Sequence, residues 1–130
     1  MSKHELTIVK GSEKFELAAP DKNWVLAYEE GYSPVQMLAS AAGACGGYVY
    51  SSILENSKIP FEFKKIEVSY VRDETKKAEP LSEITMVFHV VVALEYQERA
   101  TKCLRLVNSN CPVIQSLDPT IQVVETVEFS

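Results

Sequence analysis

The chain has 130 residues, a length that fits one domain whose core can fold without disulfides or metals. Apolar residues make up 46% and charged residues 24%, which is typical of a globular protein and argues against intrinsic disorder. The net charge of −5 provides no basic surface for phosphates, so we expect no nucleic-acid partner.

Three cysteines, Cys45, Cys103 and Cys111, show no short regular spacing. An odd number without paired spacing predicts neither a disulfide framework nor a zinc site, and we expect no metal and no cofactor. Residues 1–17 lack the apolar stretch of a signal peptide. Together these features favour the reducing cytoplasm, where paired thiols tend to be catalytic or redox-sensing.

Short apolar runs near the N-terminus predict a small antiparallel sheet. Residues 5–10 and 14–19, with a Gly-Ser pair between them, are typical of a hairpin. Residues 24–28 follow a Pro-Asp turn signal and supply a third strand.

The uncharged segment 31–54 predicts a long, buried central helix. Ser33 is a suitable N-cap, Pro34 fits the first helical position, and the helix should end near Asn56. Its small residues recur three to four apart, at Ala39, Gly43 and Gly46 or Gly47. This spacing lets another backbone approach closely, from the same chain or from a partner. A transmembrane span is the other interpretation, but Ser, Gly and Gln dilute the hydrophobicity, and we expect no membrane partner.

Alternating residues predict a second group of strands. Residues 62–72 are apolar at every second position, and residues 81–94 repeat the pattern after a charged turn, so the two form a hairpin. His89 lies on the face opposite the apolar one. Because no Cys, Asp or second His stands near it in sequence, a ligand or base role is disfavoured.

Residues 95–108 have helical spacing, with Cys103 in the apolar stripe as a small core residue. A last strand is expected over residues 121–129. Strands in groups around one central helix predict an α+β fold, with residues 1–130 as a single domain.

Cys111 precedes Pro112, which fits the first position of a short helix. The Cys111 sulfur would then face free N–H groups, which stabilise a thiolate and lower its pKa. Cys111 is therefore either reactive itself or the partner that resolves another oxidised thiol. A purely structural helix start is the alternative for the Cys-Pro pair.

Two segments resemble the cysteine motifs of the OsmC/Ohr family of osmotically inducible and organic-hydroperoxide-resistance proteins. They are SPVQMLASAAGAC, from Ser33 to Cys45, and NCPV, from Asn110 to Val113. The predicted order of elements resembles that family along nearly the whole chain. The resemblance implies an OsmC-like fold in an intertwined homodimer with thiol-dependent peroxidase sites between the subunits.

The resemblance also implies a role for each motif cysteine. Cys45 would be the peroxidatic thiol that attacks a hydroperoxide and becomes a sulfenic acid. Cys111 would be the resolving thiol that closes a disulfide. A dithiol, often a protein-bound lipoyl group, would then reduce that disulfide.

The chain departs from the family pattern at two charged positions. Val35 stands where strongly active members have a Glu, and no Arg occurs before Arg72. Apolar burial without a cation should raise the pKa of Cys45 and slow its reaction. Gln36 offers a hydrogen bond but no charge. The candidates for a replacement cation are Lys10, Lys14, Lys22 and His4, each with an exposed surface position as its alternative.

The leading functional hypothesis is a cytoplasmic, homodimeric hydroperoxide reductase in oxidative stress defence, with Tyr48 and Tyr50 as candidates to line an apolar substrate pocket. The alternative is a catalytically weakened relative that acts as a small-molecule-binding or redox-sensing module. A third hypothesis is an interaction protein held together by its central helices.

Overall fold

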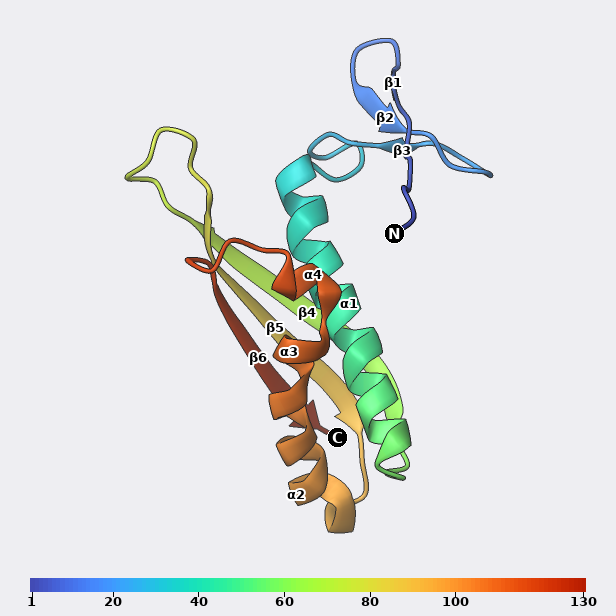
Figure 1. Ribbon diagram of the computed structural model, residues 1–130, viewed down its shortest axis with the longest axis vertical. Helices are drawn as coiled ribbons and strands as arrows, with labels where there is room; N and C mark the ends of the chain where they lie inside the picture. Colours follow the sequence, from blue (N-terminus) through green and yellow to red (C-terminus); the bar gives the residue numbers. More distant parts are fainter. The chain divides into compact units, whose positions relative to one another are not determined.

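The computed structural model describes all 130 residues, and the chain divides into two compact units, Met1–Leu38 and Ala39–Ser130. The first unit holds an antiparallel sheet of three strands, β1 (Ile8–Lys10), β2 (Phe15–Leu17) and β3 (Trp24–Val25) (Figure 1). The predicted hairpin is confirmed, because Ile8 pairs with Leu17 and Lys10 with Phe15. The third strand, predicted over residues 24–28, is limited to Trp24–Val25.

The long helix α1 (Pro34–Asn56) has the predicted boundaries. It begins with a capping box, in which the Gln36 backbone N–H donates to Ser33 Oγ at 3.2 Å and the Ser33 N–H donates to Gln36 Oε1 at 2.8 Å. Pro34 takes the first helical position. The Gln36 side chain is therefore engaged at the start of the helix.

The second unit contains a sheet in the order β4 (Glu62–Arg72), β5 (Leu81–Val91) and β6 (Gln122–Phe129). β4 and β5 form the predicted antiparallel hairpin, whereas β5 and β6 are parallel. A parallel pair needs a crossover, and the helical segments between β5 and β6 provide it.

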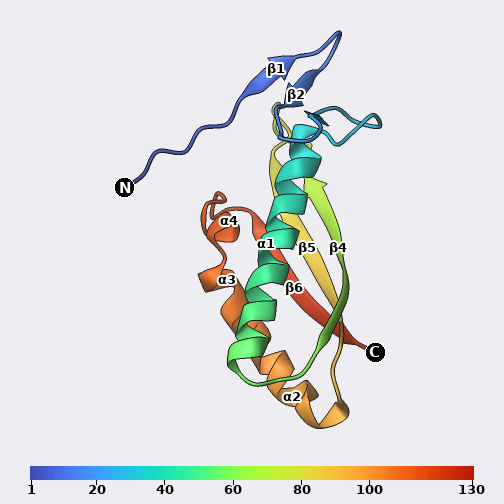
Figure 2. The same cartoon turned by 90° about the vertical axis from the view of Figure 1, so that its right-hand side faces the viewer.

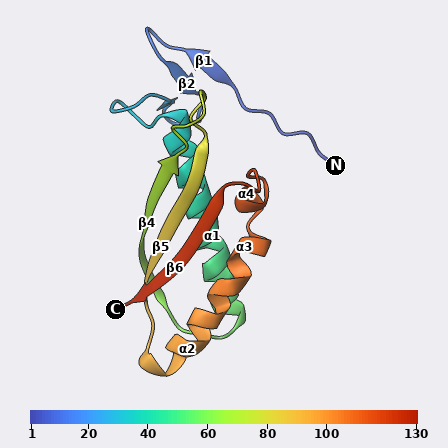
Figure 3. The same cartoon turned by 90° about the vertical axis from the view of Figure 1, so that its left-hand side faces the viewer.

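The crossover is broken into short helices, where the sequence predicts one helix over residues 95–108. It consists of α2 (Leu94–Cys103), the 3₁₀ turn η1 (Leu104–Leu106), α3 (Val107–Asn110) and α4 (Pro112–Gln115). Figures 2 and 3 show α1 and the crossover helices side by side on one face of the sheet.

The core of the second unit lies between these helices and β5. Ile84, Met86, Phe88 and Val90 are fully buried, as the alternation in β5 predicts. Tyr50 of α1 stacks on Phe88, with 5.4 Å between the ring centroids.

The glycines of α1 face this sheet. A methyl group added to Gly43 would collide with Val68, one on Gly47 would collide with Ile66, and one on Gly46 would lie 2.9 Å from Met86 Sδ. The predicted close approach is therefore confirmed, and the chain's own sheet makes it.

The other side of α1 is exposed, so the helix is not buried all round within one chain. Ala41 and Ala44 are exposed, and the Tyr48 side chain is 79% exposed. α1 is long and apolar enough to cross a membrane, but core helices meet the same criterion, and its glycine face packs against the sheet.

One carboxylate occupies a core-facing position. Glu125 of β6 is in register with the fully buried Met86 of β5, on the side of the sheet that carries the helices. Its Oε1 accepts a hydrogen bond of 3.3 Å from Asn108 Nδ2, whereas its Oε2 is buried without a partner. Burial raises the pKa of Glu125, and the Asn108 hydrogen bond lowers it by less.

This raised pKa makes the stability of the fold pH-dependent. Folded Glu125 retains its proton at pH values where the unfolded chain has released it, so this group's contribution to stability falls as pH rises above about 4.5. We predict that Glu125→Met increases the free energy of unfolding by about 1 kcal/mol at pH 8, and by less at pH 5. Urea unfolding of both proteins at the two pH values measures this.

The exposed Glu55→Met serves as the matched control, and it should change stability little at either pH. If Glu125→Met shifts stability equally at pH 5 and pH 8, ionisation of the buried carboxylate is not the cause.

Candidate functional site

The first motif cysteine lies near the middle of α1. Cys45 stands between Ala44, which is on the exposed side of the helix, and Gly46, which is buried against the sheet. Its side chain is consequently half-buried rather than deep in the core.

The second motif cysteine joins two short helices. Cys111 is the N-cap of α4, with extended backbone angles of φ −94° and ψ 110°, and Pro112 takes the first helical position as predicted. The Cys111 carbonyl accepts a hydrogen bond of 2.9 Å from the Gln115 N–H. Its side chain is 0% exposed.

The fold brings these two thiols together. The Cys45 thiol lies near enough to Cys111 to raise the pKa of Cys111, and both cysteines are free. Two residues far apart in sequence therefore meet where α3 and α4 pass α1.

The pKa of Cys111 is shifted in the direction opposite to the predicted one. Burial, followed by the neighbouring Cys45 thiol, raises the pKa of Cys111 to about 11. The amides of Ile114 and Val113 at the start of α4 do lower the pKa, as the sequence suggests, but by less than burial raises it. The expected lowered pKa is therefore wrong, because loss of hydration outweighs the helix-start amides.

Cys103 does not take part in this pair. Its sulfur lies 3.5 Å from Ser57 Oγ, and it is half-buried on the side of α2 that faces α1. Tyr50, which the sequence offers as a pocket residue, is fully buried, and its hydroxyl donates to the Ala100 carbonyl at 2.8 Å. Burial first, and Cys103 second, raise the pKa of Tyr50 well above its usual range. Tyr50 is therefore a core residue.

The candidate cations lie in the first unit. Lys14 Nζ donates to Glu30 Oε2 at 2.5 Å, and Lys10 Nζ lies 5.9 Å from the centre of the Phe15 ring. Lys22 and His4 are exposed. Each side chain thus has a surface position within its own unit, and no cation lowers the pKa of Cys111.

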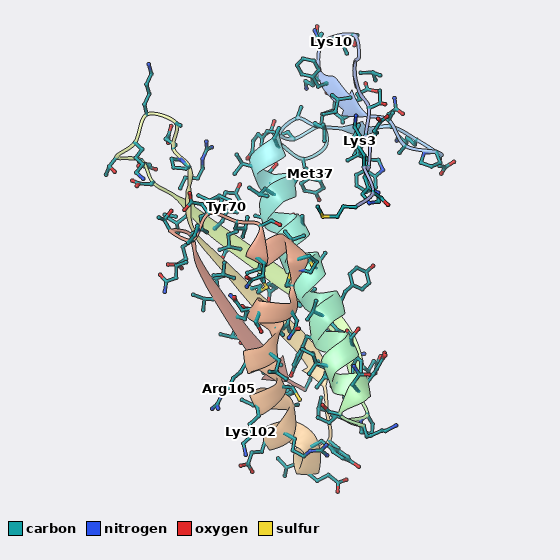
Figure 4. The ribbon with its side chains drawn as sticks, viewed as in Figure 1. Lys3, Lys10, Met37, Tyr70, Lys102 and Arg105 are labelled. Carbon is teal, nitrogen blue, oxygen red and sulfur yellow. The ribbon has the colours of Figure 1, made fainter.

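In the second unit, two cations of the crossover point away from α1. Lys102 and Arg105 project from the side of the crossover that faces away from α1 (Figure 4). Lys102 Nζ also lies 3.6 Å from Glu98 Oε1, in an exposed ion pair that contributes little. These two cations therefore do not face α1, which carries Cys45.

His89 occupies the sheet face opposite the helices, as predicted. Its Nε2 lies 2.5 Å from Glu67 Oε1 and its Nδ1 lies 3.5 Å from Glu128 Oε2, so it links the three strands β4, β5 and β6. Each carboxylate lies at a different nitrogen of the His89 ring, so the ring can pair with both neighbouring strands at once. The chain has no group of three or more His, Cys, Asp or Glu side chains that could hold a metal ion.

A groove of about 330 Å³ follows α1 beyond the thiols, and we call it the thiol groove. It is lined by Tyr48, Val49, Ser52, Ile53, Asn56 and Asn110. Only Tyr48 was proposed from the sequence. The spacing of Cys45, Val49, Ser52 and Asn56 on one helical face is a signal that could have indicated the others.

Comparison with protein families identifies the fold. A sequence model of the OsmC-like protein family matches residues 27–126, which is most of the chain. No curated protein sequence matches the chain.

Solved structures share the architecture along nearly their whole length. A hypothetical protein from Aquifex aeolicus VF5 is 23% identical with a TM-score of 0.76, over 100% of this chain and 98% of that one. An OsmC-like protein from Mycoplasma pneumoniae is 16% identical with a TM-score of 0.74, and the match covers 99% of this chain and 96% of that one. The organic hydroperoxide resistance protein OhrB of Bacillus subtilis is 16% identical with a TM-score of 0.64, and the match covers 96% of this chain and 98% of that one. At these identities the likeness shows the fold, and the predicted α+β, OsmC-like fold is confirmed.

Proposed function

Because the chain belongs to the OsmC-like protein family, we propose that it reduces hydroperoxides through a two-thiol cycle of Cys45 and Cys111. The observation that carries this proposal is the pairing of two free thiols, one half-buried and one fully buried, across α1 and the α3–α4 junction. Structural neighbours described as organic hydroperoxide resistance proteins also support it.

The cycle balances with a hydroperoxide and an external dithiol. The Cys45 thiolate attacks one peroxide oxygen, so that an S–O bond forms, the O–O bond breaks, and the leaving alkoxide takes a proton to become an alcohol. The Cys111 sulfur then attacks the sulfenic sulfur of Cys45, and the S–O oxygen leaves as water with the Cys111 proton. Two thiol–disulfide exchanges with the dithiol restore both thiols and oxidise the dithiol.

Burial supports this division of roles. A hydroperoxide from solution has access to the half-buried Cys45, whereas Cys111 is 0% exposed and accessible only to its neighbours. A resolving thiol needs to reach the sulfenic acid and nothing else. The buried partner also protects Cys45 from further oxidation once the disulfide has closed.

The high pKa of Cys111 favours a second candidate function, a redox-sensing module. Because burial raises the pKa of Cys111 to about 11, little of this side chain is thiolate at pH 7, so disulfide closure should be slow. A persistent sulfenic acid suits a sensor better than a fast enzyme. The missing charges at Val35 and in the N-terminal sheet agree with this alternative.

Disulfide closure should accelerate with pH, because ionisation of Cys111 increases up to its pKa of about 11. We predict a rise in the closure rate of about tenfold per pH unit above neutrality. Rapid-quench trapping of the sulfenic acid after one equivalent of hydroperoxide measures this rate. A rate independent of pH would show that another group deprotonates Cys111.

We also propose a homodimer and a cytoplasmic location. The exposed side of α1, with Ala41, Ala44 and Tyr48, offers a surface for a second copy. In the first unit, Phe15 and Trp24 are more than half exposed, at 59% and 57%, which is unusual for aromatics of a stable sheet.

The proposed cytoplasmic location is supported by the three free cysteines, which suit a reducing compartment.

The direct assay is hydroperoxide consumption by the purified protein. tert-Butyl hydroperoxide should be reduced repeatedly with dihydrolipoamide as the dithiol, whereas the sensor candidate predicts about one equivalent consumed per Cys45 and no sustained turnover. No consumption at all would reject both thiol-based functions.

A further inference from the structure

The turn that carries Cys111 is held by hydrogen bonds to Asn108 and Gln115. The Asn108 carbonyl accepts from the Cys111 N–H at 3.4 Å and from Gln115 Nε2 at 2.9 Å. Gln115 Nε2 also donates to Asn108 Oδ1 at 3.1 Å, and the Gln115 N–H donates to the Cys111 carbonyl at 2.9 Å. These bonds close a ring around the junction of α3 and α4, and Cys111 is part of that ring.

One contact ties the Cys111 turn to the sheet. Asn108 Nδ2 donates to Glu125 Oε1 at 3.3 Å, and the Glu125 side chain has no other hydrogen bond. Glu125 belongs to β6, which is paired with β5 along its length. By contrast, α3 and α4 have four residues each, and helices this short are not stable without tertiary contacts. The Asn108–Glu125 contact therefore anchors a weak segment to a firm one.

The Glu125 carboxylate makes this contact at a cost in stability. Its Oε2 is buried without a partner, and a buried polar group that is only half satisfied destabilises the fold relative to an apolar side chain of similar size. The core thus gains nothing from the carboxylate. Because its one hydrogen bond goes to Asn108, the effect of Glu125 falls on the Cys111 turn.

We infer that Glu125 and Asn108 are positioning residues for Cys111, and that their hydrogen bond holds the Cys111 sulfur near Cys45. A turn held in place raises the effective concentration of one thiol at the other, so the disulfide forms faster and resists reduction better. Asn108 is exposed, so this single bond changes the equilibrium several-fold rather than by orders of magnitude. The inference rests on the proposed function and adds the residues that set the strength of its disulfide.

The test measures the disulfide between Cys45 and Cys111 without any hydroperoxide. The reduced protein is equilibrated at pH 8 with oxidised and reduced dithiothreitol, and two thiol–disulfide exchanges move the disulfide from the reagent to the protein. Alkylation of the remaining thiols and peptide mapping give the equilibrium constant. Glu125→Met should lower this constant about fivefold, the loss expected for one hydrogen bond, although the same substitution stabilises the fold. An unchanged or raised constant would overturn the inference.

A conservative variant and a control identify the hydrogen bond as the cause. Glu125→Gln keeps an acceptor for Asn108 Nδ2, so its constant should stay within about twofold of wild type. Glu128→Met makes the same change on the opposite face of β6, beside His89, and should leave the constant unchanged. If Glu125→Gln falls as far as Glu125→Met, the hydrogen bond does not position Cys111.

A double variant tests whether the two residues act through one contact. Asn108→Ala changes an exposed residue, removes the same bond from its other end, and should also lower the constant. Adding Glu125→Met to Asn108→Ala should cause no further loss, because the contact is already gone. Losses that add in full would show that the two residues act separately.

Hydroperoxide consumption by the same proteins separates this inference from the proposed function. If wild type reduces tert-butyl hydroperoxide but all variants keep the wild-type equilibrium constant, the positioning role is wrong while the function stands. If the variants rank as expected in dithiothreitol but no protein consumes hydroperoxide, the positioning role stands and the proposed peroxidase function fails. A wild-type protein that forms no disulfide between Cys45 and Cys111 in this buffer would contradict both.

Discussion

Replacement of Cys45 by serine should lower hydroperoxide consumption by at least about 10³-fold, because a serine hydroxyl is not ionised at neutral pH and cannot be oxidised to a sulfenic acid. The loss should appear in the first turnover as well as in steady state. Stopped-flow consumption of tert-butyl hydroperoxide by the reduced protein measures both.

Two further serine variants distinguish the thiols. Cys103→Ser should retain full activity, because the Cys103 sulfur contacts Ser57 Oγ at 3.5 Å rather than the reacting pair. Cys111→Ser should complete the first turnover and then accumulate sulfenic acid, since the resolving sulfur is gone. Equal turnover by Cys45→Ser and wild type would remove Cys45 from the mechanism.

The largest effect on stability is expected at Gly43. A side chain there would collide with Val68, whose branched carbon is fixed by the backbone of β4 and cannot move far. We predict that Gly43→Val lowers the free energy of unfolding by about 3 kcal/mol, the upper range for overpacking a close contact. Urea unfolding monitored by circular dichroism gives the difference.

Glu55→Val is the matched control, since Glu55 is an exposed residue of α1 outside the surface proposed for a second copy, and the same side chain there should change stability by less than about 1 kcal/mol. Val68→Ala should recover part of the loss in the Gly43→Val background, because it removes the colliding methyl groups. If both valine variants are equally stable, the glycines do not set the distance between α1 and the sheet.

Local sequence patterns predicted most of the elements. The capping residues Ser33 and Pro34 and the alternation in β5 depend on neighbours in the chain, so α1 and the buried face of β5 match their predictions. The 3₁₀ turn at Leu104–Leu106 and the parallel pairing of β6 depend on contacts made after folding. No local pattern in the sequence specifies those contacts.

The candidate site was predictable in its residues but not in its electrostatics. The resemblance of two motifs to the OsmC/Ohr family pointed to Cys45 and Cys111, and the helix start at Pro112 pointed to the amides that face the Cys111 sulfur. The loss of water around Cys111 comes from the packing of several elements, and it reverses the sign of the predicted pKa shift. Glu125 shows the same limit, because one polar residue in an apolar alternation does not reveal whether its carboxylate will be paired.

The pairing of the two motif sulfurs is tested most directly by peptide mapping after the reduced protein has met one equivalent of tert-butyl hydroperoxide. The protein should lose the mass of two hydrogen atoms, and one disulfide should link the peptides that contain Cys45 and Cys111. A disulfide that involves Cys103, or thiols that remain reduced in the folded protein, would contradict the proposed cycle.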